Sequence, residues 1–399
     1  MNNFWPTKKL GEICEIRTGK KDVDEGNPNG KYPFFSCSRE INYSDAYSFD
    51  TEAILIAGNG DVGNTKIYKG KFEAYQRTYV LDKFQEDIKY IYYYLLGNLK
   101  GILVRSKSGS TMHYIRKGDL ENFNILVPES KNIQQKIVYV LDSIQTAVGA
   151  QEKIIEKTKE FRRAIMAKLF REGIRGEKLK KIEIGEIPKS WEVVKIKDVI
   201  LETLQNDPFK KPFEEIKYID VSNISNKLLK IVEYRSYLGK EAPSRARKIV
   251  KTEDVIFATV RPYLKRIAFI SLEYNGFYVS TAFCVLRSNN KIIFPSFLFY
   301  FVSRDVFVSK VCKHQTGTGY PAITDDNIKN ELISLPSLSE QQEIAGIFQT
   351  IDQKIEIEQK KKALYEELFR AMLNKIMSRE IKVDNLNLKY AAKNRKKIS

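Results

Sequence analysis

The sequence has few cysteines and almost no histidine. Its four cysteines, Cys14, Cys37, Cys284 and Cys312, lie far apart, none belongs to a C-x-x-C pair, and only two histidines could assist them. This pattern favours neither a zinc site nor a disulfide framework, and it indicates a reducing cytoplasm. No H-E-x-x-H motif is present either. We therefore expect no metal and no other cofactor.

The sequence also lacks a long apolar run. It contains no stretch of about 18 apolar residues and no basic segment followed by an apolar leader, which argues against a membrane protein. What it has instead is a formal net charge of +17, which favours a polyanionic partner, nucleic acid ahead of a membrane surface. With 399 residues, 43% of them apolar, the chain is long enough for two or more domains.

An internal repeat relates the two halves of the chain, because three matches occur in the same order in both. The first match pairs Trp5 with Trp191. The second pairs the stretch from Gly109 to Pro128 with that from Gly317 to Pro336. The third pairs Gln134 with Gln341, followed by residues 163–169 with 370–376. The alternative, unrelated segments of similar composition, does not explain the common order. The repeat predicts two copies of one supersecondary unit.

Two segments, residues 133–172 and 340–378, carry apolar residues at alternating steps of three and four, which is typical of a long amphipathic helix. Roughly 40 residues at ~1.5 Å each give a rod of ~60 Å, longer than one small domain needs. We expect the helices to pack antiparallel, rather than each on its own domain. The residues expected to pack between the helices or against a subunit are Ile137, Ile144, Ile154, Ile165, Leu169, Ile344, Ile351, Ile355, Leu368 and Met372.

The rest of the chain is rich in Tyr, Phe, Ile and Val with turn signals, which indicates mixed strands and short helices. The predicted fold is therefore α/β (α+β), with two strand-rich domains separated by two long antiparallel helices that form a coiled coil with a pseudo-twofold repeat. The predicted parts are a first domain (1–132), a first helix (133–175), a second domain with a linker at its start (176–339), a second helix (340–382) and a basic tail (383–399).

Two segments resemble a known family. Residues 183–192, preceded by residues 168–173, resemble the central conserved region of type I restriction-modification specificity subunits. Residues 336–345, with Ile351 and Asp352 after them, are similar to the family's later conserved region. The resemblance covers the whole chain, in the family's order of recognition domain, helix, recognition domain and helix.

The first copy departs from the second at two positions. Ile133 and Gln145 stand where the second copy has Glu340 and Asp352. A Glu in the first helical turn faces the helix dipole and the spare amides favourably. We therefore expect the first helix to be capped differently.

The resemblance implies a subunit without catalysis of its own, which reads a split, asymmetric target in double-stranded DNA with one domain per half. Its implied partners are two DNA methyltransferase (modification) subunits and, optionally, restriction or translocase subunits. The chain has neither the Asn-Pro-Pro-Tyr nor the Asp-Pro-Pro-Tyr tetrapeptide of a methyltransferase. A self-contained DNA enzyme, such as a site-specific nuclease, and a purely structural coiled-coil scaffold are the alternatives.

Residues 58–65 fit G-x-G-x-x-G after a strand and nearly fit a P-loop. Neither nucleotide-binding motif fits its surroundings. A P-loop needs Lys where this chain has Asn64, and a dinucleotide-binding motif needs a helix where residues 65–70 indicate a strand and turn. A plain hairpin and a DNA-approaching loop stay equally open. In the second case the contacts would come from Asn59, Asp61, Asn64 and Lys66.

Further candidate DNA contacts lie in the second half and in two matched polar loops without acids. Residues 259–266 place cations and an aromatic beside a strand end, which suits phosphate contacts from Lys and guanine contacts from Arg better than a solvated turn. Small hydroxyls, amides and glycine backbone in the loops can approach phosphate or base edges, although His113 and His314 can also be structural. The candidates are Arg261, Tyr263, Lys265 and Arg266; Arg105, Lys107, Ser110, Thr111 and His113; and Lys313, His314, Gln315, Thr318 and Tyr320.

Overall fold

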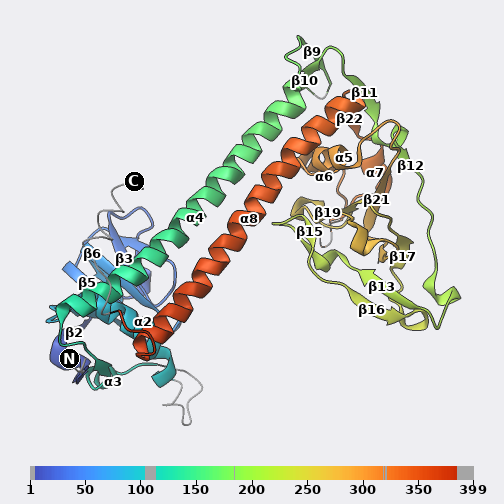
Figure 1. Cartoon of the computed structure of the whole chain (residues 1–399). Coiled ribbons are helices and arrows are strands. Elements are labelled where there is room, and N and C mark those ends of the chain that lie inside the picture. The colour runs from blue at the N-terminus through green and yellow to red at the C-terminus, as the bar shows by residue number, and fades with distance from the viewer. Residues whose placement is uncertain (1–4, 104–113, 184, 318, 320, 384–399) are drawn as a thin grey trace. The chain divides into compact units, whose positions relative to one another are not determined.

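The computed structural model describes residues 5–103, 114–183, 185–317, 319 and 321–383 (Figure 1). The chain forms two compact units, the first from Met1–Lys153 with Gln359–Ser399 and the second from Ile154–Glu358. The long helices α4 (Lys131–Glu172) and α8 (Leu338–Met377) each contribute one half to each unit. The helices thus begin close to the predicted residues 133 and 340.

The first unit is built on one six-stranded sheet of order β2-β7-β5-β6-β3-β4, antiparallel except where β3 pairs parallel with β6. Its strands are β2 (Glu15–Thr18), β3 (Tyr32–Phe35), β4 (Asn42–Ser44), β5 (Phe49–Ala57), β6 (Thr65–Ala74) and β7 (Thr78–Asp82). The short pair β1 (Thr7–Lys9) and β8 (Asn124–Leu126) and the helices α1 (Leu10–Ile13), α2 (Ile88–Leu103) and α3 (Lys117–Glu121) complete it.

The core of the first unit joins the sheet to both long helices. Ile54 and Leu81 of the sheet, Tyr90 of α2, Leu141 of α4 and Leu373 of α8 belong to one buried cluster. The alternating and helical apolar patterns of the sequence therefore meet in a single core.

The second unit has two four-stranded sheets, of order β12-β21-β18-β19 and β16-β13-β20-β17. Their strands are β12 (Ile200–Leu201), β13 (Glu215–Ile219), β16 (Arg235–Leu238), β17 (Ala246–Ile249), β18 (Val255–Ala258), β19 (Ile267–Phe269), β20 (Tyr278–Ser280) and β21 (Phe283–Ser288). Three two-stranded pairs accompany them: β9 (Leu179–Ile182) with β10 (Gly185–Pro188), β11 (Glu192–Lys195) with β22 (Leu332–Leu335), and β14 (Ile224–Ser225) with β15 (Lys230–Ile231). The helices are α5 (Pro295–Val302), α6 (Asp305–Cys312) and α7 (Asp325–Lys329).

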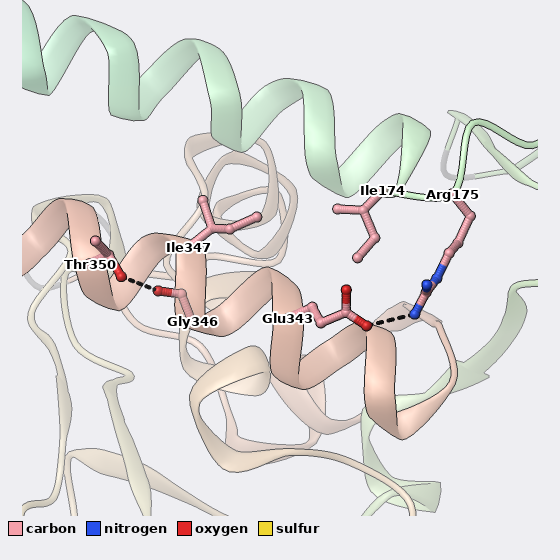
Figure 2. A pocket seen from close by; sticks show the side chains of 6 residues that line it. All are labelled: Ile174, Arg175, Glu343, Gly346, Ile347 and Thr350. Atoms are coloured by element: carbon pink, nitrogen blue, oxygen red, sulfur yellow. Dashed lines mark hydrogen bonds and ion pairs between the residues drawn. The ribbon is translucent and has the colours of Figure 1, made fainter.

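Aromatic rings close the core of the second unit. Phe170 of α4 stacks on Phe348 of α8, with ring centroids 5.7 Å apart, and also contacts Phe297 of α5. Beyond the end of α4, a shallow groove of about 530 Å³ is bordered by the ion pair between Arg175 and Glu343, whose charged atoms are 2.6 Å apart (Figure 2).

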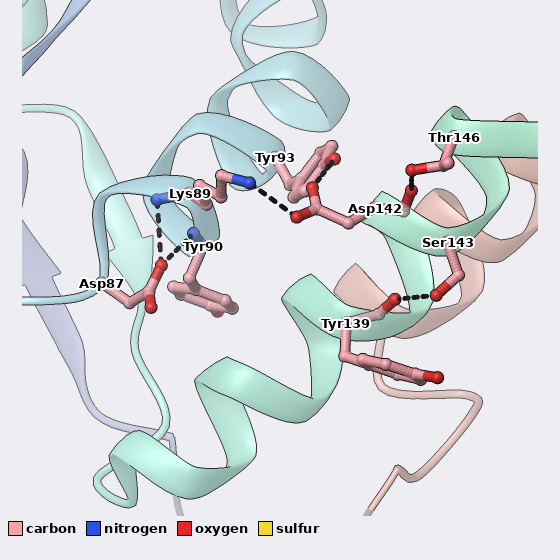
Figure 3. Close-up of polar contacts among 8 residues, drawn as sticks. All are labelled: Asp87, Lys89, Tyr90, Tyr93, Tyr139, Asp142, Ser143 and Thr146. Carbon is pink, nitrogen blue, oxygen red and sulfur yellow. Dashed lines mark hydrogen bonds and ion pairs between the residues drawn. The ribbon is translucent and has the colours of Figure 1, made fainter. Parts of the chain in front are cut away.

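The two units make a similar side-chain contact, although the carboxylates do not occupy equivalent positions of the repeat, because Asp352 aligns with Gln145 and not with Asp142. In the first unit the Asp142 carboxylate of α4 accepts hydrogen bonds from the Tyr93 hydroxyl and from Lys89 Nζ, each over 2.6 Å (Figure 3). In the second unit the Asp352 carboxylate of α8 accepts from the Tyr300 hydroxyl over 3.0 Å and from Arg162. Each unit thus ties one tyrosine to a carboxylate of the long helix that begins in that unit.

Within each unit the two helix halves run antiparallel. Arg162 pairs with Asp352 and Phe170 with Phe348 in the second unit, so the numbers rise along one helix as they fall along the other. The prediction of an α/β (α+β) chain with two strand-rich parts, two long antiparallel helices and an internal repeat is confirmed. The compact units divide the chain inside both helices, however, so the domain boundaries at 132, 175, 339 and 382 stay a prediction.

The helix positions expected to pack between the helices or against a subunit differ in burial, and their packing stays a prediction. Ile137, Leu169, Ile344 and Ile351 are buried, and Ile144, Ile165, Ile355 and Met372 are partly buried against the two cores. Ile154 and Leu368 are 41% and 44% exposed, whereas the next residues, Ile155 and Phe369, are buried. A helix of 3.6 residues per turn drifts relative to a 3.5-residue pattern, which moves the buried face by one position.

The two copies differ at this helix start, and the Glu340 carboxylate forms hydrogen bonds outside its own helix rather than with the spare amides of the first turn. Its buried carboxylate accepts hydrogen bonds from Trp191 Nε1, over 3.2 Å, and from the Ile174 backbone N–H, over 3.0 Å. In the first unit, Trp5 lies instead beside the Arg379 guanidinium, 5.6 Å from the ring centroid. The carboxylate therefore secures the chain after α4 and has no counterpart at Ile133.

Candidate DNA interface

The glycine-containing segment of the first unit is the connection of a β-hairpin. Strand β5 ends at Ala57, whose N–H donates to the Asn64 carbonyl over 2.9 Å, and β6 begins directly at Thr65. The expected strand after residue 64 is thus confirmed. Gly60 and Gly63 have φ values of +61° and +78°, which glycine adopts without strain. These two glycines therefore allow the tight turn between β5 and β6, as expected for a hairpin connection.

This hairpin loop is tied to a neighbouring segment before β4. The Asp61 carboxylate accepts a hydrogen bond from Arg39 Nε over 2.8 Å, and Lys66 Nζ donates to the Ser38 carbonyl over 2.9 Å. Partial burial lowers the pKa of Lys66. Asn59 and Asn64 lie half-buried on the same loop. The loop thus presents amides and two cations around a single carboxylate.

The residues that follow the first polar loop in the chain contact this same hairpin. The Ile115 N–H donates to the Gly58 carbonyl over 2.8 Å, and the Tyr79 hydroxyl donates to the Ile115 carbonyl over 2.8 Å. Tyr114 is 48% exposed, and Arg116 donates to its hydroxyl over 2.8 Å. The predicted contacts Arg105, Lys107, Ser110, Thr111 and His113 lie outside the described residues.

The second unit repeats this junction with the same backbone pairing. The Ile323 N–H donates to the Thr259 carbonyl over 2.9 Å, as Ile115 does to Gly58, and the Arg261 N–H donates to the Pro321 carbonyl over 2.7 Å. In both units, the residues directly after the polar loop in the sequence therefore lie beside the loop that follows a central strand.

The predicted contacts in residues 259–266 divide into two groups. Arg261 and the 51% exposed Tyr263 lie at the loop, and Arg261 has a left-handed backbone with φ of +48°. Lys265 is paired with Asp305 over 2.6 Å. Arg266 donates to the Val221 and Ile224 carbonyls over 2.8 and 3.1 Å, so this guanidinium ties its own segment to the turn at residues 221–224.

The second polar loop is only partly described. Lys313 is exposed, whereas His314 Nε2 lies 3.0 Å from the Glu331 carboxylate, which also pairs with Lys310. The Gln315 side-chain nitrogen is buried without a hydrogen-bond partner among the described residues. Thr318 and Tyr320 lie outside the described residues. The structure thus gives His314 a structural partner, which is the alternative that the sequence left open.

Sequence reasoning missed Arg39, Tyr114 and Arg116. Arg39 and Asp61 are far apart in the chain, so only the folded hairpin brings them together. Tyr114 and Arg116 directly follow the first polar loop, and an aromatic beside a cation at that point was the signal that could have revealed them.

Catalysis would need a metal site or a reactive side chain in the described part of the chain. No cluster of three or more His, Cys, Asp or Glu side chains suited to a metal ion occurs among these residues. Burial raises the pKa of the Cys14 thiol to about 12 and also raises that of the Cys284 thiol, so both thiols are protonated at neutral pH. None of the described helices is both long and apolar enough to span a lipid bilayer.

Comparison with known proteins identifies relatives over nearly the whole chain. A family described as the type I restriction modification DNA specificity domain matches residues 2–160 and again residues 188–367. The EcoDI specificity subunit of Escherichia coli is 27% identical over 373 residues, covering 85% of this chain and 79% of the relative. The MjaVIII specificity subunit of Methanocaldococcus jannaschii is 27% identical over 413 residues, covering 96% and 94%.

A solved structure shows the same fold. The S subunit of a type I restriction-modification system from M. genitalium aligns with a TM-score of 0.59 at 16% identity, covering 94% of this chain and 96% of that one. The two family matches coincide with the two halves of the internal repeat.

Proposed function

This chain belongs to the type I restriction modification DNA specificity family, and from that membership we propose that it reads a bipartite, asymmetric target in double-stranded DNA, with one strand-rich part for each half. The observation that carries the proposal is the repeated loop junction. In the first unit Ile115 bonds to Gly58, and in the second Ile323 bonds to Thr259. The same hydrogen bond thus joins the loop after a central strand to the residues that follow a polar loop. Two equivalent junctions with different side chains suit two different half-sites.

The contacts proposed in each half follow from residue chemistry. In the first unit Asn59, Asp61, Asn64 and Lys66 present amides and charge on the hairpin loop. In the second unit Arg261 and Tyr263 take this place, with Lys313 on the neighbouring loop. Arg and Asn are the side chains that recognise base edges, whereas Lys neutralises phosphates. The net charge of +17 supports a polyanionic partner of this kind.

The proposed partners are two DNA methyltransferase (modification) subunits, with restriction or translocase subunits as further members of the complex. The E. coli and M. jannaschii relatives are specificity subunits of type I restriction enzymes. In this proposal the chain scaffolds the complex in the cytoplasm and has no catalytic centre of its own.

Two experiments test the proposal. The methylated motifs of cells that carry this gene with its modification partner are compared with those of cells that lack it; a split motif present only with the gene is expected. Purified chain alone is then incubated with DNA, Mg²⁺ and S-adenosylmethionine, and no cleavage or methylation is expected. Turnover by the chain alone would instead favour a self-contained DNA enzyme.

A further inference from the structure

The Arg39 guanidinium in the first unit is held at one edge only. Its Nε donates to Asp61 over 2.8 Å, and the arginine side chain is 81% exposed. Among the described residues, the terminal nitrogens of Arg39 make no hydrogen bond or ion pair. The N–H groups of the terminal nitrogens are therefore available to a ligand, while the Nε edge of the same planar guanidinium is fixed by Asp61.

The surroundings hold both members of this pair in place. The Asp61 N–H donates to the Cys37 carbonyl over 3.4 Å, and Lys66 Nζ donates to the Ser38 carbonyl over 2.9 Å. The segment that carries Arg39 is thus bound to the hairpin loop from two sides. An exposed ion pair stabilises a fold little, so stability alone does not explain an arrangement held in this way.

We propose that Arg39, positioned by Asp61, recognises a guanine in the half-site bound by the first unit. This inference rests on the proposed function, and it assigns a base type and a reading residue to one half of the target. The open fork of an arginine matches the O6 and N7 acceptors of guanine in the major groove. Holding Nε on a carboxylate orders the fork before DNA arrives, which lowers the entropy lost on binding.

A base edge suits this pair better than a phosphate. Arg39 and Asp61 together carry no net charge, so the pair releases few counterions on binding. A phosphate at the fork would also approach the Asp61 carboxylate, which it repels, whereas the guanine edge is uncharged. Lys66 offers the unneutralised cation for a phosphate nearby.

The test uses the complete complex with its modification subunit. The motif methylated by the parent complex is determined first, which settles the proposed function independently. Arg39→Ala and Arg39→Lys are then compared with Arg171→Ala, which removes an arginine from an exposed ion pair with Glu186 outside the interface. Arg39→Lys keeps the charge but lacks the planar fork, so it remains informative if the alanine variant folds poorly.

We expect both Arg39 variants to lose discrimination at one guanine of one half-site by roughly 10- to 100-fold, with the other half-site and the Arg171 variant unchanged. Asp61→Asn should weaken recognition at the same guanine only, as a positioning residue does. Replacing that guanine by 7-deazaguanine in a duplex should cost the parent complex affinity and cost Arg39→Ala none.

Two results would overturn the inference. An unchanged motif in both Arg39 variants would show that Arg39 reads no base. A uniform loss of affinity for all sequences, together with a smaller salt dependence, would make Arg39 a phosphate contact. In either case the split motif of the parent complex would still stand.

Discussion

One matched pair of the internal repeat, Gln134 and Gln341, has the same structural role in both units. Gln134 and Gln341 are fully buried at the starts of α4 and α8. Gln341 donates to the Pro336 and Ile292 carbonyls and accepts from the Phe294 N–H, and Gln134 makes the corresponding bonds to the Pro128 carbonyl and from the Asp87 N–H. One amide thus secures each helix start to the helix beside it.

We predict that Gln341→Ala lowers the free energy of unfolding by roughly 2 kcal/mol or more, because it leaves buried backbone groups without partners. The neighbouring Gln342 is exposed, so Gln342→Ala is a matched control that should change stability little. Chemical denaturation of the two variants measures the difference. Equal stabilities would show that the buried amide contributes nothing.

Arg261 is the residue at which recognition in the second unit is best tested. Arg261→Ala should lower affinity or relax specificity at one half-site only, by roughly 1 to 3 kcal/mol for a bidentate base contact. Arg175→Ala, which breaks an exposed ion pair with Glu343, is the control. Duplex binding by the assembled complex provides the measurement, and unchanged affinity with an unchanged methylated motif would count against the contact.

At the scale of elements, sequence periodicity predicted the two long helices but not every residue on their buried faces. The three-and-four pattern predicted two long helices, and α4 and α8 occupy those places. The pattern did not predict which side of α4 is buried near residue 154, where Ile155 is buried and Ile154 is exposed. Which face is buried depends on the partner helix, which a single helix pattern does not contain.

We predict that Ile155→Ala destabilises the chain by roughly 2 kcal/mol or more, because it opens a cavity between packed side chains. Ile154→Ala should be nearly neutral, since Ile154 is 41% exposed and alanine favours helix. Thermal unfolding of the pair separates the two outcomes. A larger loss of stability for Ile154→Ala than for Ile155→Ala would show that Ile154 lies on the packed face of the helix, as the sequence pattern predicted.

The loops were predictable in position but not in all their contacts. The order of strand, glycine loop and strand excluded nucleotide binding at residues 58–65, and the hairpin agrees. The carbonyl partners of Arg266 come from residues some forty positions earlier in the chain, so its bracing role could not be read from residues 259–266 alone. The same separation hid the pairing of Arg39 with Asp61.

At the scale of the whole molecule, the excess of positive charge makes a direct prediction. If Lys and Arg contacts release condensed counterions, the logarithm of affinity should fall linearly with the logarithm of salt, with a slope of about 0.9 for each phosphate contacted. Titrations of the complex with duplex DNA over a range of KCl concentrations measure this slope. A salt-independent affinity would contradict the phosphate contacts.

We also propose that the helices set the gap between the two half-sites, because α4 and α8 both continue from one unit into the other. Four added residues lengthen a helix by ~6 Å and rotate it by ~40° beyond a full turn. One base pair spans ~3.4 Å and turns DNA by a similar angle. A matched insertion in both helices should therefore widen the gap by one or two base pairs.

The most direct measurement is the methylome of cells that carry the modification partner and a chain with four residues inserted between Lys153 and Ile154 and four between Glu358 and Gln359. The parent chain and a chain with the first insertion alone are the controls, and folded complex is verified by purification. We expect the same two half-sites with a wider gap. An unchanged gap with altered bases, or the loss of one half-site alone, would contradict the account of two independent readers.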